Sequence, residues 1–241
     1  MMRLLVLMVG LLGANALAAE IYGASEQSFA FEFKLGPYMP LIDRDEALTT
    51  DPYYATYGNA PMLMGELELD YQFWRPFGSI AVGFTFGYAE KFAPAIDATT
   101  LTPATESTGL RVFPMKLLAV YRWDWAANKH NIPLVPYLKA GFVAEPWWVV
   151  KGGKTETADG REGTGVRFGV AATIGLALQI DFLDPRLARD FDTSAGVNHT
   201  YLFAEWTITE VNNFGAKTSK GTATGLDLSS RSPFFGLAVE F

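Results

Sequence analysis

The chain ends in Phe234-Phe235-Gly236-Leu237-Ala238-Val239-Glu240-Phe241, and this stretch decides how the rest of the sequence is interpreted. Every second side chain in it is apolar and large, and the last residue of the chain belongs to that apolar set. An alternation with a period of two is typical of a β-strand that has one apolar face. The end of the chain therefore predicts a strand in which Phe235, Leu237, Val239 and Phe241 share one face.

The same alternation recurs in seven earlier segments, which are separated by turn residues. Taken in steps of two, the apolar rows run over Phe29–Leu35, Leu67–Phe73, Ile80–Tyr88, Met115–Trp123, Leu138–Ala144, Val166–Ile180 and Leu202–Ile208. A period of two that is sustained over eight segments predicts an all-β protein. Leu110 and Val112 have the opposite parity to the row that starts at Met115, so a β-bulge is predicted near Pro114.

The connections between these segments alternate in length. Two of them are short, at Arg75–Gly78 and Ala126–Pro133. Four others are long, at Tyr38–Ala60, Glu90–Gly109, Lys151–Gly163 and Asn212–Gly225. Short turns on one side and long loops on the other predict an eight-stranded antiparallel transmembrane β-barrel. The four longer loops would be extracellular, and both chain ends would lie on the short-turn side.

The third connection on the short-turn side, Leu183–Asn198, is longer than this pattern requires. Asp184 suits the N-cap position of a helix, and Pro185 suits the first helical position. We therefore predict a short helix in this third periplasmic turn.

The beginning of the chain has the features of an export signal. Arg3 supplies a positive charge, Leu4–Leu12 is apolar, and Ala16-Leu17-Ala18 is a small-x-small cleavage site. Residues 1–18 are predicted to be a signal peptide, and residues 19–241 an outer-membrane β-barrel domain. The apolar stretch is too short for a membrane-spanning helix, and no later run approaches the roughly 18 apolar residues that one needs. The chain has no cysteine, which fits passage through an oxidising periplasm.

The alternation alone leaves two interpretations open, because a soluble barrel with an apolar interior would show the same period. Three features favour the membrane barrel. Glycines such as Gly83 and Gly175 lie on the alternate face, where they suit a crowded, narrow lumen. Trp74 and Trp123 fall at strand ends, where aromatic side chains meet the lipid interfaces. The export signal and the terminal Phe241 complete the set, and outer-membrane lipid is then the first predicted partner.

In the membrane interpretation, the charged side chains of the alternate face point into the lumen. The predicted lumen charge network is Lys34, Glu66, Glu68, Lys116, Lys139, Arg167 and Glu205, with Glu32, Asp70 and Glu145 on the same face. Such a set could form a proton or ion path, or a polar ligand site. We favour a paired network that fills the lumen, because eight strands leave room for little more than side chains.

The sequence offers little support for dedicated chemistry. A hydrolase needs a nucleophile and a base, but the two histidines, His130 and His199, both fall on the short turns. Neither histidine has another metal ligand at a useful spacing. We therefore expect no catalytic residue, no cofactor and no metal site. The net charge of −7 argues against a nucleic-acid partner.

The first long loop carries two small clusters. Its acidic residues could hold a calcium ion, but they lack the glycine turn and ligand spacing of a calcium loop, so a solvated acidic loop is favoured. Its tyrosines could anchor a partner or pack the loop onto the barrel rim, and the sequence does not choose between the two. The acidic residues are Asp43, Asp45, Glu46 and Asp51, and the tyrosines are Tyr53, Tyr54 and Tyr57.

Over its mature length, the chain resembles small bacterial outer-membrane barrels of the OmpA, OmpX and OmpW-like class. Two stretches resemble an uncharacterised outer-membrane β-barrel family of myxobacteria. They are Phe31-Glu32-Phe33-Lys34-Leu35-Gly36-Pro37-Tyr38 and Val197-Asn198-His199-Thr200-Tyr201-Leu202-Phe203-Ala204-Glu205. The resemblance implies insertion by the barrel-assembly machinery, which would read Phe235, Leu237, Val239 and Phe241 in the last strand. It implies no catalytic residues.

The sequence thus predicts a non-enzymatic barrel of the cell outer membrane, with a structural or surface-interaction role and a possible extracellular ligand at its long loops. A narrow channel for small or apolar solutes is the alternative. A lipid-modifying barrel enzyme is the third hypothesis.

Overall fold

The computed structural model describes residues 28–44, 48, 50–96, 103–130, 132–152, 154–158, 161–216 and 225–241. The signal peptide predicted at residues 1–18 lies outside the described residues and stays a prediction. No helix within the described residues has the length and apolar character that crossing a membrane requires.

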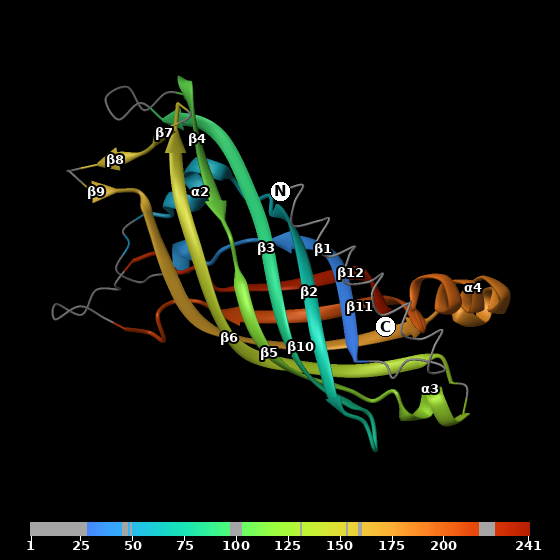
Figure 1. Ribbon diagram of the computed structural model, residues 1–241. Coiled ribbons are helices and arrows are strands. Elements are labelled where there is room, and N and C mark those ends of the chain that lie inside the picture. Colours follow the sequence, from blue (N-terminus) through green and yellow to red (C-terminus); the bar gives the residue numbers. More distant parts are fainter. Residues whose placement is uncertain are drawn as a thin grey trace.

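The described strands form a closed ring of eight, in which every neighbouring pair is antiparallel (Figure 1). They are β1 (Phe29–Tyr38), β2 (Met62–Trp74), β3 (Ser79–Ile96), β4 (Pro103–Val112) with β5 (Met115–Arg122), β6 (Leu134–Lys151), β10 (Thr164–Gln179), β11 (His199–Glu210) and β12 (Ser230–Glu240). β4 and β5 together occupy one place in the ring, since both pair with β3 and β6. The predicted eight-stranded antiparallel barrel is confirmed.

The ring closes where the last strand meets the first. β12 pairs with β1, and Phe33 lies opposite Leu237 in that register. The carbonyl oxygen of Phe241 accepts hydrogen bonds from the backbone N–H groups of Ser28 and Phe29, at 3.0 and 2.8 Å. Closure leaves neither strand with an unpaired edge, which would otherwise expose a row of backbone donors and acceptors. The alternating end of the chain is therefore the closing strand of the barrel.

The two faces of the sheet have inverted polarity compared with a soluble barrel. On the outer face, Phe84 and Ile174 are 50% and 62% exposed, whereas Glu68 and Lys139 on the inner face are 1% and 2% exposed. The same alternation runs along the other strands, whose apolar rows point outwards as the sequence predicted. A soluble barrel with an apolar interior would show the opposite arrangement of these rows.

The bulge predicted near Pro114 is absent from the described pairing. The strand is interrupted at Phe113 and Pro114, but β4 and β5 keep the same register against β3, with Val112 opposite Ala89 and Met115 opposite Phe86. Leu110 and Val112 simply point inwards and are 2% and 0% exposed. Their inward parity marks the part of the lumen where apolar side chains replace charged ones.

One end of the barrel, the long-loop end, carries larger excursions (Figure 1). The first loop contains η1 (Ile42–Arg44) and α2 (Pro52–Tyr57), and the third contains β7 (Lys154–Thr155), β8 (Thr157–Ala158) and β9 (Arg161–Glu162). The second excursion was predicted as a loop over Glu90–Gly109, but most of it is a hairpin, because β3 and β4 continue to pair as far as Ile96 and Pro103. This part of the hairpin lacks the apolar alternation, so the sequence pattern did not reveal it.

The other end, the short-turn end, carries α3 (Trp125–His130), η2 (Asp181–Leu183) and α4 (Pro185–Ala195). The helix predicted in the third turn is α4, and it begins at Pro185 as expected. Oδ1 of Asp184 accepts a hydrogen bond from the backbone N–H of Arg186 at 3.1 Å. The side chain of Asp184 therefore caps the start of α4, as predicted.

Candidate functional site

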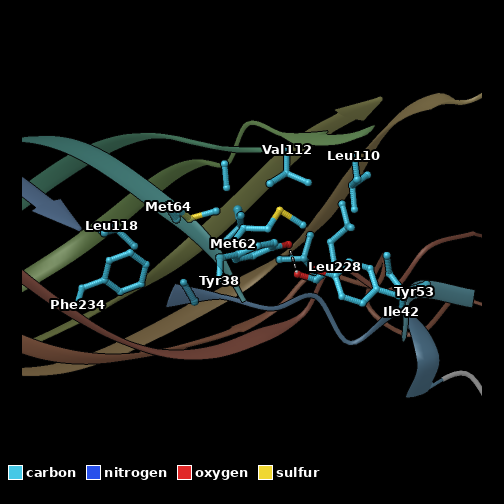
Figure 2. Close-up of a cluster of buried hydrophobic side chains, with 14 of the residues drawn as sticks. Tyr38, Ile42, Tyr53, Met62, Met64, Leu110, Val112, Leu118, Leu228 and Phe234 are labelled. Atoms are coloured by element: carbon cyan, nitrogen blue, oxygen red, sulfur yellow. Dashed lines mark hydrogen bonds between the residues drawn. The ribbon is translucent and has the colours of Figure 1, made fainter. Parts of the chain in front are cut away.

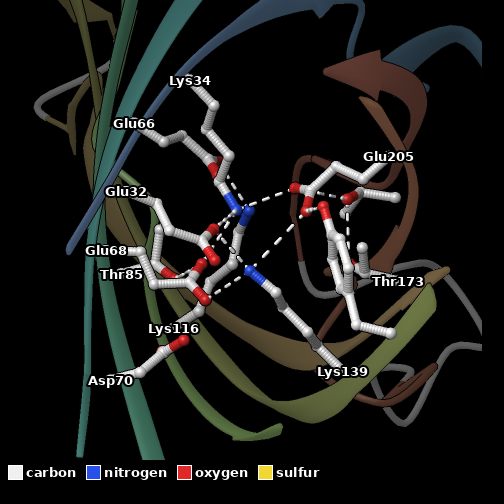
Figure 3. Close-up of polar contacts among 12 residues, drawn as sticks. Glu32, Lys34, Glu66, Glu68, Asp70, Thr85, Lys116, Lys139, Thr173 and Glu205 are labelled. Carbon is white, nitrogen blue, oxygen red and sulfur yellow. Dashed lines mark hydrogen bonds and ion pairs between the residues drawn. The ribbon is translucent and has the colours of Figure 1, made fainter. Parts of the chain in front are cut away.

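The middle of the lumen holds a set of buried ionisable side chains, which we call the charged cluster (Figure 3). It draws on five strands, β1, β2, β5, β6 and β11, because the period of two turns every second side chain of each strand inwards. The cluster consists of Glu32, Lys34, Glu66, Glu68, Asp70, Lys116, Arg122, Lys139 and Glu205. Each of these side chains is at most 4% exposed.

Two lysines form the centre of the charged cluster. Nζ of Lys34 lies 2.8 Å from Glu68 and 2.7 Å from Glu205. Nζ of Lys139 lies 2.6 Å from Glu32 and 2.6 Å from Glu68. Glu68 is thus shared between two ammonium groups on strands from opposite parts of the sequence. These contacts tie β1, β2, β6 and β11 together across the lumen.

The other two cations extend the cluster along the barrel. Nζ of Lys116 lies 2.5 Å from Glu66. The guanidinium of Arg122 donates to Glu32 and lies 3.2 Å from Asp70. These cations bring the remaining carboxylates into the same network.

The cations are required by the register of the sheet. Glu32 and Glu68 lie directly opposite each other in the β1–β2 ladder, an arrangement that destabilises a sheet when the two charges are alike. Lys139 contacts both carboxylates, and so compensates for that repulsion. Burying an ion costs several kcal/mol unless it is paired and hydrogen-bonded, so the cluster is stable only as a unit.

Neutral side chains add hydrogen bonds to the charged cluster, and they were not among the predicted network residues. The hydroxyl of Tyr137 donates to Glu205 at 3.0 Å, and that of Thr85 donates to Glu68 at 2.9 Å. Towards the short-turn end, Tyr201 and Gln72 donate to Glu240 at 2.8 and 2.9 Å. All of these residues have inward parity on their strands, which is the signal that could have found them. Arg122 was missed in the same way, since it has the parity of Lys116.

The structure brings together Lys34, Glu66, Glu68, Lys116, Lys139 and Glu205 of the predicted network. Arg167 is buried too, but it lies outside the charged cluster. It is opposite Glu145 in the β6–β10 register, and its guanidinium lies against the backbone of Gly225 at the long-loop end. Glu145 itself accepts a hydrogen bond from Tyr38 at 2.7 Å.

The lumen around the charged cluster is tightly filled, as the inward glycines predicted. A Cβ atom on Gly175 would collide with the ring of Tyr137. A Cβ atom on Gly83 would collide with Oδ1 of Asp70. Both atoms would fall far inside van der Waals contact, so these two glycines make room for side chains of the neighbouring strands.

Between the charged cluster and the long loops, the lumen is filled by apolar side chains, which we call the apolar plug (Figure 2). It consists of Tyr38, Ile42, Tyr53, Met62, Met64, Leu110, Val112 and Leu228, each at most 7% exposed. The hydroxyl of Tyr38 donates to Glu145 and is 3.0 Å from the carbonyl oxygen of Leu228, which links the plug to the polar interior. The plug is a second core inside the barrel.

The first long loop folds down onto the apolar plug. Asp43 holds it there, because its carboxylate accepts hydrogen bonds from the backbone N–H groups of Tyr53 and Tyr54 at the start of α2, at 2.8 and 2.9 Å. Tyr53 is 2% exposed within the plug, whereas Tyr54 is 58% exposed. The tyrosines of the first loop therefore have different roles. Tyr53 packs the loop onto the rim, and Tyr54 faces outwards. Burial, with the charges of Tyr57 and Asp43 nearby, raises the pKa of Tyr53 to about 12.

The two described acidic residues of that loop both lie at the start of α2. Asp43 caps α2, and Asp51 directly precedes it. The other two, Asp45 and Glu46, lie outside the described residues, so the solvated loop stays a prediction for them.

A cavity of about 310 Å³ lies above the plug, lined among others by Tyr57, Thr108 and Lys151.

The two histidines lie apart on the short-turn end. Nδ1 of His199 is 2.7 Å from Oδ2 of Asp181, while His130 stacks edge-on against Trp125 in α3. Burial alone would raise the pKa of Asp181, but hydrogen bonds from His199, Gln179 and the backbone of Thr200 lower it. Asp181 is therefore an ionised anchor for this end of the barrel.

Within the described residues, the group with the geometry to hold a metal ion is Glu32, Glu68 and Asp70, whose oxygens lie within 4.8 Å of one another. Lys139 and Arg122 already supply positive charge to these carboxylates. A metal ion would have to displace a resident cation from a closed interior. The chemistry of the charged cluster is that of internal ion pairing.

No family model matches this sequence, and no curated protein matches it either. Among solved structures, neisserial surface protein A (NspA) is similar over 91% of this chain and 99% of its own, at 14% identity and a TM-score of 0.46. A major outer membrane protein of Thermus thermophilus matches over 90% and 100%, at 11% identity and a TM-score of 0.45. The attachment invasion locus protein Ail of Yersinia pestis, in complex with the heparin analogue sucrose octasulfate, matches over 89% and 97%, at 11% identity and a TM-score of 0.42.

The eight-stranded antiparallel ring itself rests on the strand pairing of this chain. The narrower resemblance to a myxobacterial family stays a prediction.

Proposed function

We propose that this protein is an integral outer-membrane β-barrel with a structural or surface-interaction role and no catalytic activity. The observation that carries the proposal is the inverted polarity of the barrel wall. Large apolar side chains such as Phe142 and Ile174 are 65% and 62% exposed on the outside, while the charged cluster is enclosed.

This arrangement suits hydrocarbon and not water. A Lys or Arg side chain on the lipid-facing surface would cost about 2–4 kcal/mol at the bilayer midplane, and the charged cluster avoids that cost by lying inside. The closed ring also pairs the backbone groups of the strands, which hydrocarbon demands because each unpaired group would cost several kcal/mol. The long loops then lie on the cell surface, and the short-turn end with α4 lies on the periplasmic side of the membrane.

A surface role is favoured over transport because two separate sets of side chains fill the lumen. The charged cluster fills the middle, and the apolar plug fills the long-loop half. A solute would have to break buried ion pairs and displace well-packed side chains. The channel hypothesis remains the alternative, and the loops are the surface that an extracellular ligand would meet.

Planar-bilayer recording tests this proposal against the channel. The purified barrel, refolded into detergent and inserted into a planar bilayer, is expected to give no steady single-channel steps at neutral pH. A variant that carries both Leu110→Ala and Leu228→Ala is the matched control, because it thins the plug and leaves the charged cluster intact. Steady steps from the unmodified protein would favour the channel. Solubility of the folded protein without detergent would contradict the membrane assignment itself.

Insertion by the barrel-assembly machinery is a further part of the proposal. Phe241 contributes two backbone acceptor contacts that close β12 on the first strand, and its ring stacks on Phe29 at 6.0 Å. Deleting Phe241 is expected to lower the yield in the outer membrane and to leave aggregate in the periplasm. Pulse-chase fractionation measures this, with Phe214→Ala at the long-loop end as the control. An unchanged yield of the truncated chain would contradict the role of the last residue.

A further inference from the structure

The connection between β10 and β11 carries an exposed apolar surface at the short-turn end. Three large side chains contribute to it, and we call them the turn patch: Phe182 and Leu183 in η2, and Phe191 in α4. They are 56%, 70% and 46% exposed. Figure 1 shows α4 projecting from the barrel at the end where β10 and β11 meet their short turn. η2 and α4 contact each other, and large exposed apolar side chains on neighbouring elements offer an interaction surface.

The turn patch is held in a fixed place relative to the barrel wall. Oδ1 of Asp181 accepts a hydrogen bond from the backbone N–H of Thr200 at 2.9 Å, and its Oδ2 contacts His199 at 2.7 Å. The backbone N–H of Ile180 donates to the carbonyl of Thr200 at 2.9 Å. At the far end of the connection, the N–H of Asn198 donates to the carbonyl of Glu240 at 2.7 Å. These hydrogen bonds therefore hold the connecting segment against the ends of β10 and β11.

The turn patch also continues the outer face of the barrel. The outward row of β10 runs through Ile174 and Leu176, which are 62% and 47% exposed, towards Leu178 and Ile180. Phe182 and Leu183 follow that row directly in the chain. α4 is amphipathic, with polar exposed side chains at Asp190, Thr193 and Ser194. The apolar band of the wall thus extends past the strand end onto a segment that also has a polar side.

We propose that the turn patch inserts into the periplasmic leaflet of the outer membrane, with phospholipid as its partner. The inference rests on the proposed membrane function. Amphipathic segments with aromatic and aliphatic side chains on one face lie at the boundary between headgroups and acyl chains. Here the wall of the barrel delivers the patch to that boundary, and the contacts of Asp181 keep it there. The long third turn would then anchor the short-turn end of the barrel at the surface of the periplasmic leaflet.

The absence of cysteine from the chain makes a direct test possible. Single-cysteine variants Phe182→Cys, Phe84→Cys and Tyr54→Cys are labelled with the environment-sensitive dye NBD. Each is reconstituted into nanodiscs of phosphatidylethanolamine and phosphatidylglycerol. Phe84 on the barrel wall reports lipid contact, and Tyr54 on α2 reports water. A heat-modifiable shift on a gel confirms that each variant is folded.

The NBD label at position 182 is expected to be quenched by shallow doxyl-labelled lipid at least about twofold more than the label at position 54. It is expected to be protected from aqueous iodide. If position 182 is open to iodide and insensitive to doxyl lipid while position 84 is quenched, the turn patch faces water or a protein, and this inference is overturned alone. If position 84 also fails to contact lipid, the proposed membrane function fails with it.

Discussion

The charged cluster and the apolar plug occupy the same lumen, yet the chain builds them differently. The charged cluster takes its members from strands, where the period of two fixes which side chains point inwards. The plug combines strand residues such as Met62 and Leu110 with Ile42 from η1 and Tyr53 from α2. A strand residue is positioned by its ladder, whereas a loop residue is positioned only when the loop folds back. The two halves of the lumen therefore depend on interactions of different range.

The difference also has an energetic side. Each ion in the charged cluster is stable only because its partners are present, since an unpaired buried charge carries the whole desolvation penalty. Each apolar side chain in the plug contributes by its own burial and packing, so its loss leaves a cavity but strands no charge. Substitutions should separate these two kinds of interior.

The largest effect is expected from Lys139→Met. The substitution leaves Glu32 and Glu68 facing each other without the cation that contacts both. Removing one partner of a buried ion pair costs about 3–5 kcal/mol of unfolding free energy. Urea unfolding in lipid vesicles measures the loss. Lys154→Met, at an exposed lysine of β7, is the matched control and should cost under about 0.5 kcal/mol. Equal costs for the two variants would mean that the cluster contributes nothing as a unit.

A smaller effect is expected from Leu110→Ala in the plug. Leu110 is 2% exposed, and truncating a buried leucine costs about 2–5 kcal/mol, depending on how far the cavity collapses. We expect the lower part of that range, because the adjoining loop can relax into the space. Leu117→Ala is the control, since that side chain is 54% exposed on the outer wall, where lipid fills the gap. The same unfolding measurement should show the plug variant as the less stable of the two.

Alkaline pH should loosen the plug before it disturbs the strands of the charged cluster. The pKa of Tyr53 is raised from 10.0 to about 12, so the folded state holds the neutral phenol more tightly than the unfolded state does. The stability this supplies is complete below pH 10 and is lost as the pH rises towards 12. Hydrogen exchange of the α2 amides should speed up over that window. Tyr53→Phe should abolish the dependence, and its persistence in that variant would assign it to another group.

The smallest effect is expected from Asp70→Asn. The charged cluster has five carboxyl groups and four cations, and each cation keeps another carboxylate partner when the Asp70 side chain is made neutral. Asp70 contacts Arg122 at 3.2 Å, whereas Glu32 makes a closer contact with the same guanidinium. The unfolding free energy should change by less than about 1 kcal/mol. A loss as large as that of Lys139→Met would show that Asp70 is an essential partner of Arg122.

Particular residues show how far sequence reasoning reached. The parity of Lys34, Glu68 and Lys139 placed them in the lumen, and the structure brings them into contact. Parity could not predict that Arg167 lies at the long-loop end. It shows which face of the sheet a side chain is on, but not how far along the barrel axis the side chain lies. It also marked Leu110 and Val112 as an irregularity, when they are the first sign of the plug.

The barrel could be predicted from the order of residues alone: its eight alternating segments, the inversion of apolar and charged faces, the closing strand at Phe241 and the helix at Pro185. These features follow from neighbours a few residues apart, whose period and capping are local. The folded arrangement was needed to learn which charges pair, that Tyr53 completes the plug, and that Asp43 holds α2 above it. Those outcomes depend on the register between strands and on loops that fold across the barrel end, and contacts between distant segments leave no periodic trace in one sequence.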